Sequence, residues 1–242
     1  MHKKFAIIIT GYLRTFEKNF PYLKNIFTDY DIFVYSIEKK EHYKIIKNLD
    51  IEYFELIKDS EIDTREFKIY NNLFLNPRTI ALDSNLPKDN TGWLKQLRDY
   101  QFAINWFNNN FHSNYEYVVR YRPDLKPVKI KKINFIPGIF NCFQQNTYKN
   151  QINDKFFLGN KDTMTFIMNN LYESLKDENI SRYADKPFNV EQYIFNFLEG
   201  NKIEINYLDK NSLKFKKNVD GKLLSAGFNQ YNFNTLKNRL FD

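Results

Sequence analysis

The stretch Tyr115-Glu-Tyr-Val-Val-Arg-Tyr-Arg-Pro-Asp-Leu125 decides the fold that the rest of the sequence is expected to adopt. Its segment Tyr117 to Tyr121 is β-branched and aromatic, which is the composition of a buried strand. Pro123 has no N–H group to donate to a sheet ladder, so we expect the strand to end near Arg122. The chain then turns at the carboxyl edge of a sheet, where open α/β sheets bind their ligands.

Charged side chains come together at this expected edge. Arg120 and Arg122 supply two guanidinium groups, and Asp124 supplies a carboxylate. Guanidinium groups match the oxygens of phosphate, and a carboxylate at the edge suits a divalent cation that bridges a diphosphate. A strand that simply ends in a surface ion pair explains the same residues, and the stretch by itself favours neither interpretation.

The N-terminal segment predicts a strand, a turn and a helix. Residues Lys3 to Thr10 form an apolar run without alternation, which is typical of a strand buried on both faces in a parallel sheet. Gly11-Tyr-Leu-Arg14 follows as a turn, and Thr15 is the expected N-cap of a helix over residues 16–27. A single glycine is not the GxGxxG fingerprint, so the motif is weak evidence for a nucleotide site. Arg14 would reach a phosphate there, or serve only as a surface cation.

The remaining sequence predicts alternating strands and helices. Strands are expected at 31–36, 51–56, 135–143 and 203–208, and helices at 41–49, from Gly92, at 161–174 and from Pro187 to a cap at Gly200. Residues 126–132 are interpreted as a basic connection, and Val219 to Lys222 as a hairpin-like turn. Residues 60–90 read as a long loop and are a candidate lid over a ligand. This order predicts an α/β fold with a mostly parallel sheet.

Several polar positions are weighed as parts of a site. Asp29-Tyr-Asp31 has the spelling of a DxD metal motif, but it precedes a strand and is therefore interpreted as a turn at the opposite edge. Asn153-Asp-Lys-Phe-Phe-Leu-Gly159 places Asp154 just ahead of a short strand, close to where a second substrate would lie. Gln96 and Asp99 would bond a ligand only if they face the sheet edge, and solvent exposure is the default.

Composition bounds the class of protein. The 242 residues, 18% of them aromatic, are enough for one large domain over residues 1–242. The net charge of +7 suggests anionic partners, but scattered lysines favour a solvated surface, and no nucleic-acid partner is expected. The single cysteine, Cys142, excludes an internal disulfide and is expected to be a small buried side chain. No apolar run approaches the roughly 18 residues that cross a bilayer, so we expect a soluble, cytoplasmic protein, with peripheral membrane contact left open.

The order of these segments resembles that of small GT-A-fold glycosyltransferases, of the kind found in large viruses and in surface-polysaccharide gene clusters. The resemblance spans Phe5 to about Leu208, and its most specific motif is the Arg-x-Arg-Pro-Asp that ends at Asp124. It implies a GT-A-like, Rossmann-like sheet flanked by helices, with a nucleotide-binding half at about 1–125 and an acceptor-side half at about 126–242.

The resemblance also implies a reaction. Such enzymes move a sugar from a nucleotide-diphosphate donor to a hydroxyl of a glycan or glycoprotein acceptor, with Mn²⁺ or Mg²⁺ on the diphosphate. A UDP-sugar is favoured as the donor because UDP is the commonest donor nucleotide among the enzymes that this sequence resembles, and a GDP-sugar is the close alternative.

Binding residues carry over from the resemblance by position. Asp124 matches the last acid of the DxD motif and would ligate the metal, whereas Arg122 stands where the first Asp of that motif usually stands. That departure leaves one protein carboxylate for the cation and puts strict metal dependence in question. The loop that holds base, ribose and phosphate in such enzymes is matched by Gly11, Tyr12, Leu13 and Arg14.

Two acids are candidates for the chemistry. Asp154 matches an acidic position near the acceptor, and Glu191 matches a recurrent acid at the start of a late helix. If the reaction inverts the anomeric centre, a carboxylate must take the acceptor proton, with Asp154 the first candidate and Glu191 the second. If it retains, no such base is needed. Asp154 could instead be a turn former, and Glu191 an acid favoured by a helix dipole. The leaving diphosphate would be stabilised by Arg14, Arg120 or Arg122 with a metal.

Two other functions stay open on sequence alone. A basic module that binds single-stranded nucleic acid fits the positive charge and the tyrosines, although no standard motif or basic stripe is present. A catalytically inactive relative that binds nucleotide sugars would differ from the enzyme only by the lack of turnover.

Overall fold

A computed structural model describes residues 5–27, 30–63, 92–111, 114–130, 135–144, 152–176, 190–208, 213–219 and 222–225. The strands are β1 (Phe5–Thr10), β2 (Tyr30–Ile37), β3 (Tyr53–Ile57), β4 (Tyr117–Tyr121), β5 (Leu125–Ile130), β6 (Phe140–Gln144), β7 (Ile152–Asn160), β8 (Ile205–Tyr207), β9 (Leu213–Val219) and β10 (Lys222–Ser225). The helices are α1 (Phe16–Ile26), α2 (Lys40–Asn48), α5 (Gly92–Phe111), α6 (Lys161–Glu173) with the 3-10 turn η3 (Ser174–Lys176), and α7 (Val190–Gly200). Most of the candidate lid at residues 60–90 lies outside the described residues.

The main sheet has seven strands in the order β3-β2-β1-β4-β7-β6-β8. Strands β1, β2, β3 and β4 are mutually parallel. Strand β7 is antiparallel to both of its neighbours, and β6 and β8 again run parallel to each other. The sheet is therefore mostly parallel with one reversed strand, and the expected α/β class is confirmed.

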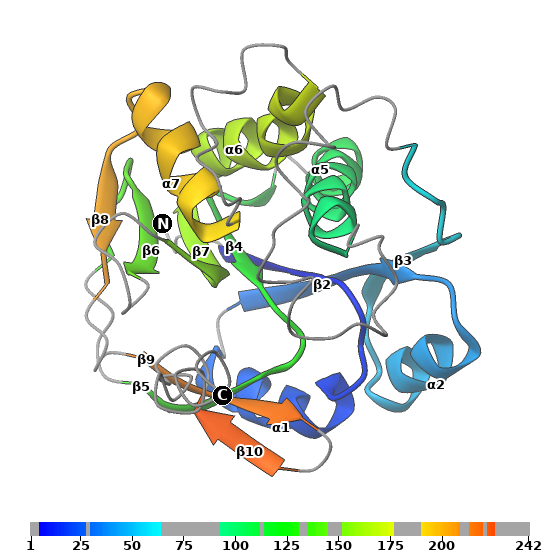
Figure 1. Ribbon diagram of the computed structural model, residues 1–242. Helices are drawn as coiled ribbons and strands as arrows, with labels where there is room; N and C mark the ends of the chain where they lie inside the picture. The colour runs from blue at the N-terminus through cyan, green and yellow to red at the C-terminus, as the bar shows by residue number, and fades with distance from the viewer. Residues whose placement is uncertain are drawn as a thin grey trace, which may run out of the picture.

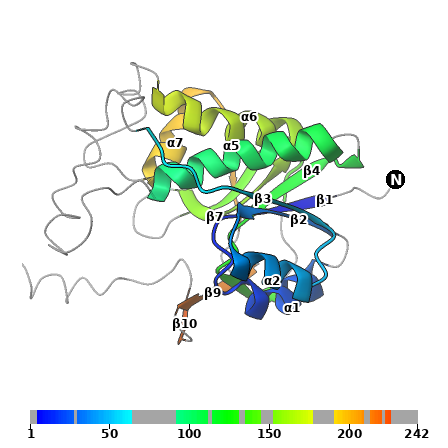
Figure 2. The same ribbon diagram turned by 90° about the vertical axis from the view of Figure 1, so that its right-hand side faces the viewer.

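Helices cover both faces of this sheet. Figures 1 and 2 show α5, α6 and α7 on one face, and α1 and α2 on the other, where the smaller sheet also lies. The central strand β1 serves both layers, because Ala6 and Ile8 pack with α5 and α6 while Ile7 and Ile9 pack with α1. This placement explains the unbroken apolar run of β1, since both faces of a parallel strand are buried.

The pairing of β1 with β4 positions the candidate site. Ile9 pairs with Tyr121, so the turn that begins at Gly11 and the turn that begins at Arg122 leave adjacent strands at the same edge of the sheet. Their strands lie at a point where the strand order reverses, since the chain leaves β1 for β2 on one side and β4 lies on the other. Open α/β sheets bind ligands at such switch points.

Asp31, the last acid of the DxD-like segment, lies at the other edge, as expected, and Asp29 lies outside the described residues. Asp31 is near the beginning of β2, and its Oδ2 accepts a hydrogen bond of 2.5 Å from the hydroxyl of Tyr115, just ahead of β4. This places Asp31 at the amino ends of two parallel strands, away from Asp124.

The connection expected over residues 126–132 is wrong, because Leu125–Ile130 forms β5. This strand pairs with β9 in an antiparallel three-stranded sheet of order β10-β9-β5. Pro127 is tolerated because β5 is an edge strand whose register shifts between Pro127 and Lys129. The expected hairpin is confirmed by the pairing of Val219 with Lys222.

Two expected boundaries are also wrong. The strand expected from residue 135 begins only at Phe140, because the chain turns at Gly138, whose φ is +83°. Gly200 is the last residue of α7 rather than its left-handed cap, and the positive φ of 56° falls on Lys202. The thiol of Cys142 is buried in β6, as expected, and burial raises its pKa above the ordinary range.

In the parts of the chain that the structure describes, no helix combines the length and the apolar character that crossing a membrane requires.

Candidate functional site

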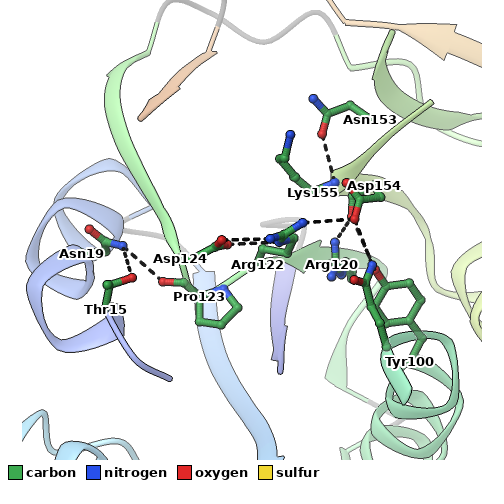
Figure 3. A network of polar contacts seen from close by, with 11 residues as sticks. Thr15, Asn19, Tyr100, Arg120, Arg122, Pro123, Asp124, Asn153, Asp154 and Lys155 are labelled. Carbon is green, nitrogen blue, oxygen red and sulfur yellow. Dashed lines mark hydrogen bonds and ion pairs between the residues drawn. The ribbon is translucent and has the colours of Figure 1, made fainter. Parts of the chain in front are cut away.

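Arg122 joins two carboxylates from different elements (Figure 3). Its Nε and Nη2 donate to the two oxygens of Asp124, at 3.1 and 2.8 Å. Its Nη1 donates to Oδ2 of Asp154 at 3.2 Å, across the boundary between β4 and β7. The backbone holds the same boundary, because the N–H of Arg122 donates to the carbonyl of Lys155 at 3.2 Å. One guanidinium therefore locks the turn after β4 to the first half of β7.

Asp154 is a buried carboxylate inside β7, not a residue ahead of a short strand. It is the third residue of a nine-residue strand and is 4% exposed. Because β7 runs antiparallel to β4, its beginning lies at the edge where β4 ends, which brings Asp154 beside Arg122. Gln96 of α5 donates to the same Oδ2 at 3.0 Å. Gln96 thus faces the sheet edge.

The charge of Asp154 is stabilised by its neighbours. Burial alone would raise its pKa, but the positive charges of Arg122 and Arg120 outweigh burial and hold the pKa below its usual value. The same ion pair acts on the other partner, since Asp154 and Asp124 raise the pKa of Arg122 in spite of its burial. Asp154 is therefore ionised at neutral pH.

Arg120 is buried rather than presented at the edge. It is 1% exposed, and its guanidinium lies 4.3 Å from the ring centroid of Tyr100 and 5.7 Å from that of Phe157. It donates to the backbone carbonyl of Asp154, which also accepts from the Tyr100 hydroxyl at 3.4 Å. Arg120 is thus a support for β7, and this packing does not favour direct contact with a diphosphate.

Glu191 lies in the first turn of α7, close to the same cluster. Burial raises its pKa, and the negative charge of Asp154 raises it further. Burial lowers the pKa of Lys155. The charge of Arg122 also lowers this pKa, and the charges of Asp154, Glu191 and Asp124 act in the opposite direction. The two acids proposed for the chemistry are therefore brought together, with pKa values pushed in opposite directions. Such divergence is typical of paired carboxylates with different roles.

The turn from Gly11 to Arg14 lies beside the cluster on the neighbouring strand. Gly11 has a φ of +106°, in the left-handed region that glycine adopts at low cost. Tyr12 is 39% exposed, and two cations lie near its ring: the Nζ of Lys39 at 4.7 Å and the guanidinium of Arg14 at 5.2 Å from the centroid. Leu13 is buried under the sheet edge. The turn thus exposes Tyr12 and Arg14 to solvent and buries Leu13 in the core.

Asn19 ties the first helix to the arginine turn. Its Nδ2 donates to the carbonyl of Pro123 at 3.2 Å and to the hydroxyl of Thr15 at 3.4 Å, and the side chain is 1% exposed (Figure 3). This bond spans the gap between the element after β1 and the turn after β4. It links the two halves of the candidate site.

A divalent cation at Asp124 fits this arrangement poorly. Both oxygens of Asp124 accept from the positively charged fork of Arg122. Within the described residues no group of three or more His, Cys, Asp or Glu side chains is placed to hold a metal ion. A cation would therefore share its one carboxylate with a guanidinium, which repels it.

A pocket of about 460 Å³ opens further along, beside α2 and the edge strand β3. It is lined by Glu38, Lys39, Lys40, Tyr43, Phe54, Glu55 and Leu56. The pocket does not include Arg122 or Asp124, but it shares Lys39 with the surroundings of Tyr12. The charged cluster, in which Arg122 pairs with both Asp124 and Asp154, is the more specific arrangement of the two.

Sequence reasoning missed part of this site. Asn19 and Tyr100 carry no motif and reach the site through the fold, and Lys155 lies inside the quoted segment Asn153 to Gly159 without having been given a role. One available signal was an asparagine on the expected inner face of α1, because a buried amide in an apolar stripe requires a polar partner.

Comparisons with known proteins add no family to this description: no protein-family model matches the sequence. No curated protein matches it either.

Proposed function

We propose that the protein is a glycosyltransferase that moves a sugar from a nucleotide-diphosphate donor to a hydroxyl of a glycan or glycoprotein acceptor. One observation carries the proposal. The turns after the adjacent parallel strands β1 and β4 bring Arg14 and Arg122 to one edge of the sheet, beside two carboxyl groups with opposed pKa shifts. The GT-A-like fold that the resemblance implies is part of the proposal, supported by the mostly parallel sheet.

The donor would lie across the two turns. Breaking the bond between the sugar and the diphosphate leaves the electron pair on a phosphate oxygen, and guanidinium groups stabilise that charge. Arg14 lies on the first turn, and Arg122 is 23% exposed at the side chain, so both are accessible to a ligand. Tyr12 offers an exposed ring for the nucleoside. UDP is the favoured nucleotide, with GDP second.

Glu191 is the better candidate for a general base. The Asp154 carboxylate is paired with the charge of Arg122 and accepts a hydrogen bond from Gln96, and a carboxylate with a lowered pKa is a weak base. Glu191 has a raised pKa, which brings it nearer to the range in which a base works efficiently. In an inverting reaction the Glu191 carboxylate would take the proton of the acceptor hydroxyl as that oxygen bonds to the sugar carbon. Asp154 would then hold Arg122 in position.

No step of this proposal passes through a metal ion. The Mn²⁺ or Mg²⁺ that the resemblance implies would require nucleotide binding to withdraw Arg122 from Asp124. An ion that bridges substrate phosphates needs few protein carboxylates, so binding with and without metal is a direct test.

The decisive experiment measures binding and turnover separately. Calorimetric titration with UDP and GDP, each with and without Mn²⁺, is expected to show binding that weakens in Arg14→Ala and not in the α1 surface control Lys18→Ala. Release of free sugar from UDP- and GDP-sugars then tests turnover. Absence of binding to every nucleotide would overturn the proposal.

The same assays separate the alternatives. Nucleotide-sugar binding without any hydrolysis or transfer would identify an inactive relative. Salt-dependent binding of single-stranded oligonucleotides, in the absence of nucleotide-sugar binding, would identify a nucleic-acid-binding module instead.

A further inference from the structure

Two side chains hold the backbone on both sides of Tyr12. The hydroxyl of Ser36 in β2 donates to the carbonyl of Gly11 at 2.8 Å. The N–H of Leu13 donates to Nε2 of His42 in α2 at 3.3 Å. His42 and Ser36 are each 3% exposed. We call this pair the Ser36–His42 clamp.

The contacts of His42 specify one tautomer. Its Nδ1 lies 2.9 Å from the carbonyl of Ile37, and a carbonyl only accepts, so Nδ1 carries the proton. Nδ1 also lies 3.1 Å from the hydroxyl of Ser36. Nε2 is then the unprotonated nitrogen, which is what the N–H of Leu13 requires. The imidazole that fits this site is neutral.

Protonation would break the clamp. A proton on Nε2 would face the N–H of Leu13 at a separation of 3.3 Å, and two donors cannot share a hydrogen bond. One of the two groups would have to move, so the backbone at Leu13 or the imidazole of His42 in α2 would leave its present position. The movement would reach Tyr12 and Arg14, the two residues of the turn that are placed to meet a ligand.

The surroundings of His42 keep it neutral. Burial lowers its pKa, and the positive charges of Lys39 and Arg14 lower it further, while the Ile37 carbonyl and the charge of Glu41 act in the opposite direction. The ring of Tyr12 packs edge-on against the imidazole, with centroids 5.8 Å apart. The clamp is therefore closed at neutral pH.

We propose that His42 is a positioning residue that holds the turn from Gly11 to Arg14 in its ligand-binding conformation only while its imidazole is neutral. Nucleotide binding then weakens as the pH falls. This inference rests on the proposed function, and it adds to it a residue outside the charged cluster and a dependence on pH.

The test compares His42→Gln with the wild-type protein. The side-chain oxygen of glutamine can accept from Leu13 near the position of Nε2, but it takes up no proton between pH 5 and pH 8. His42→Leu removes the acceptor altogether, and Lys44→Gln on the exposed face of α2 is the matched control. Affinity for UDP and GDP is measured from pH 8 to pH 5 for each protein.

The ratio of affinities is the readout, because the diphosphate itself titrates near pH 6 and this contribution cancels between variants. Wild-type affinity relative to His42→Gln is expected to fall, approaching about tenfold for each pH unit below the His42 midpoint. His42→Leu is expected to bind weakly at every pH, and Lys44→Gln to behave as the wild type.

Nuclear magnetic resonance tests the clamp without any nucleotide. The amide signal of Leu13 is expected to shift with the same midpoint as the His42 ring signals. The inference is overturned if the Leu13 amide signal does not change as His42 titrates. It is also overturned if the pH dependence of binding is identical in the wild type and His42→Gln. If no nucleotide binds at any pH, the inference fails together with the proposed function. The Leu13 titration then shows whether the hydrogen bond between Leu13 and His42 depends on pH.

Discussion

Nη1 of Arg122 lies 3.2 Å from Oδ2 of Asp154, in an ion pair between the turn after β4 and the antiparallel strand β7. The Asp154 side chain is 6% exposed and the Arg122 side chain 23%. The pair is thus open to solvent on the arginine side only. An arginine in this position can stabilise a buried strand and still present positive charge to a ligand.

Removing Arg122 is expected to affect stability and binding together. Arg122→Ala leaves Asp154 buried with one fewer cation. Breaking a buried ion pair typically lowers the free energy of unfolding by roughly 3–5 kcal/mol, and the loss here should be smaller because solvent screens the exposed arginine side. Arg122→Lys keeps the charge without the fork, so it should lose less stability and retain weaker nucleotide binding. Urea unfolding and calorimetric titration measure the two effects. Equal stability of all three proteins would contradict the pairing.

The Asp154 carboxylate is expected to make stability depend on acid pH. Its pKa in the folded protein is lowered, so its contribution is present above the ordinary aspartate pKa of about 3.9 and is lost as the pH falls through the folded-state value. Asp154→Asn should therefore be less stable than the wild type at pH 7, and the difference should shrink below about pH 4. Urea unfolding between pH 3 and pH 7 measures this. A difference that does not change with pH would exclude the ionised state inferred for Asp154.

Glu191→Gln separates catalysis from stability. Loss of a general base is expected to lower kcat by roughly 10²–10⁴-fold with little change in donor affinity. Because burial disfavours the charge of Glu191, the neutral glutamine should leave stability at pH 7.5 unchanged or slightly higher. Glu199→Gln, on the exposed end of the same helix, is the control. Full activity in Glu191→Gln would mean either that Asp154 is the general base or that the reaction retains the anomeric configuration.

Asp99 offers a test of a buried carboxyl group that takes no part in the proposed chemistry. Burial raises the pKa of this α5 residue to about 6, against the opposing charge and hydrogen bond of Arg98. The raised pKa means that the folded state loses stability as the pH rises from about 4 to about 6. Asp99→Asn should therefore be more stable than the wild type at pH 7.5, by up to about 3 kcal/mol, and not at pH 4. The exposed Asp162→Asn should show no such gain in thermal unfolding at the two pH values.

Asn19→Leu tests the link between the two turns. The substitution removes the bond to the Pro123 carbonyl while it keeps a side chain of similar size, and one buried hydrogen bond contributes about 1 kcal/mol. Nucleotide affinity should fall more than this stability change implies, because the two turns would lose the hydrogen bond that links them. Unchanged affinity with reduced stability would limit Asn19 to a structural role.

Local pattern was sufficient for the elements that build the sheet edge. The unbroken apolar run of β1 and the β-branched run of β4 each reflect burial on two faces, and both strands lie where they were expected. Their shared direction is that of strands joined by helical connections, which parallel neighbours require. The proximity of Gly11 and Arg122 could therefore be predicted, since parallel strands bring their carboxyl ends to one edge.

Local pattern was not sufficient where pairing partners are distant in sequence. β5 was expected to be a connection, because its partner β9 lies more than 80 residues further along the chain. Asp154 was expected ahead of a strand, because polar residues at the beginning of a segment do not resemble a buried strand. Arg122 and Gln96, which make its burial possible, come from distant parts of the sequence. A buried charge is stable only when its partners are present, and no periodicity encodes them.

The sequence by itself determined the α/β class, the strands β1 and β4, and the position of Arg122 and Asp124 at the end of β4, because burial periodicity and turn chemistry act over a few residues. Only the tertiary structure decided that Arg120 is buried, that Arg122 bridges Asp124 and Asp154, and that His42 supports Leu13 from 29 residues away. Those contacts depend on the reversed direction of β7 and on the packing of α2 against the first turn, which are properties of the whole folded chain.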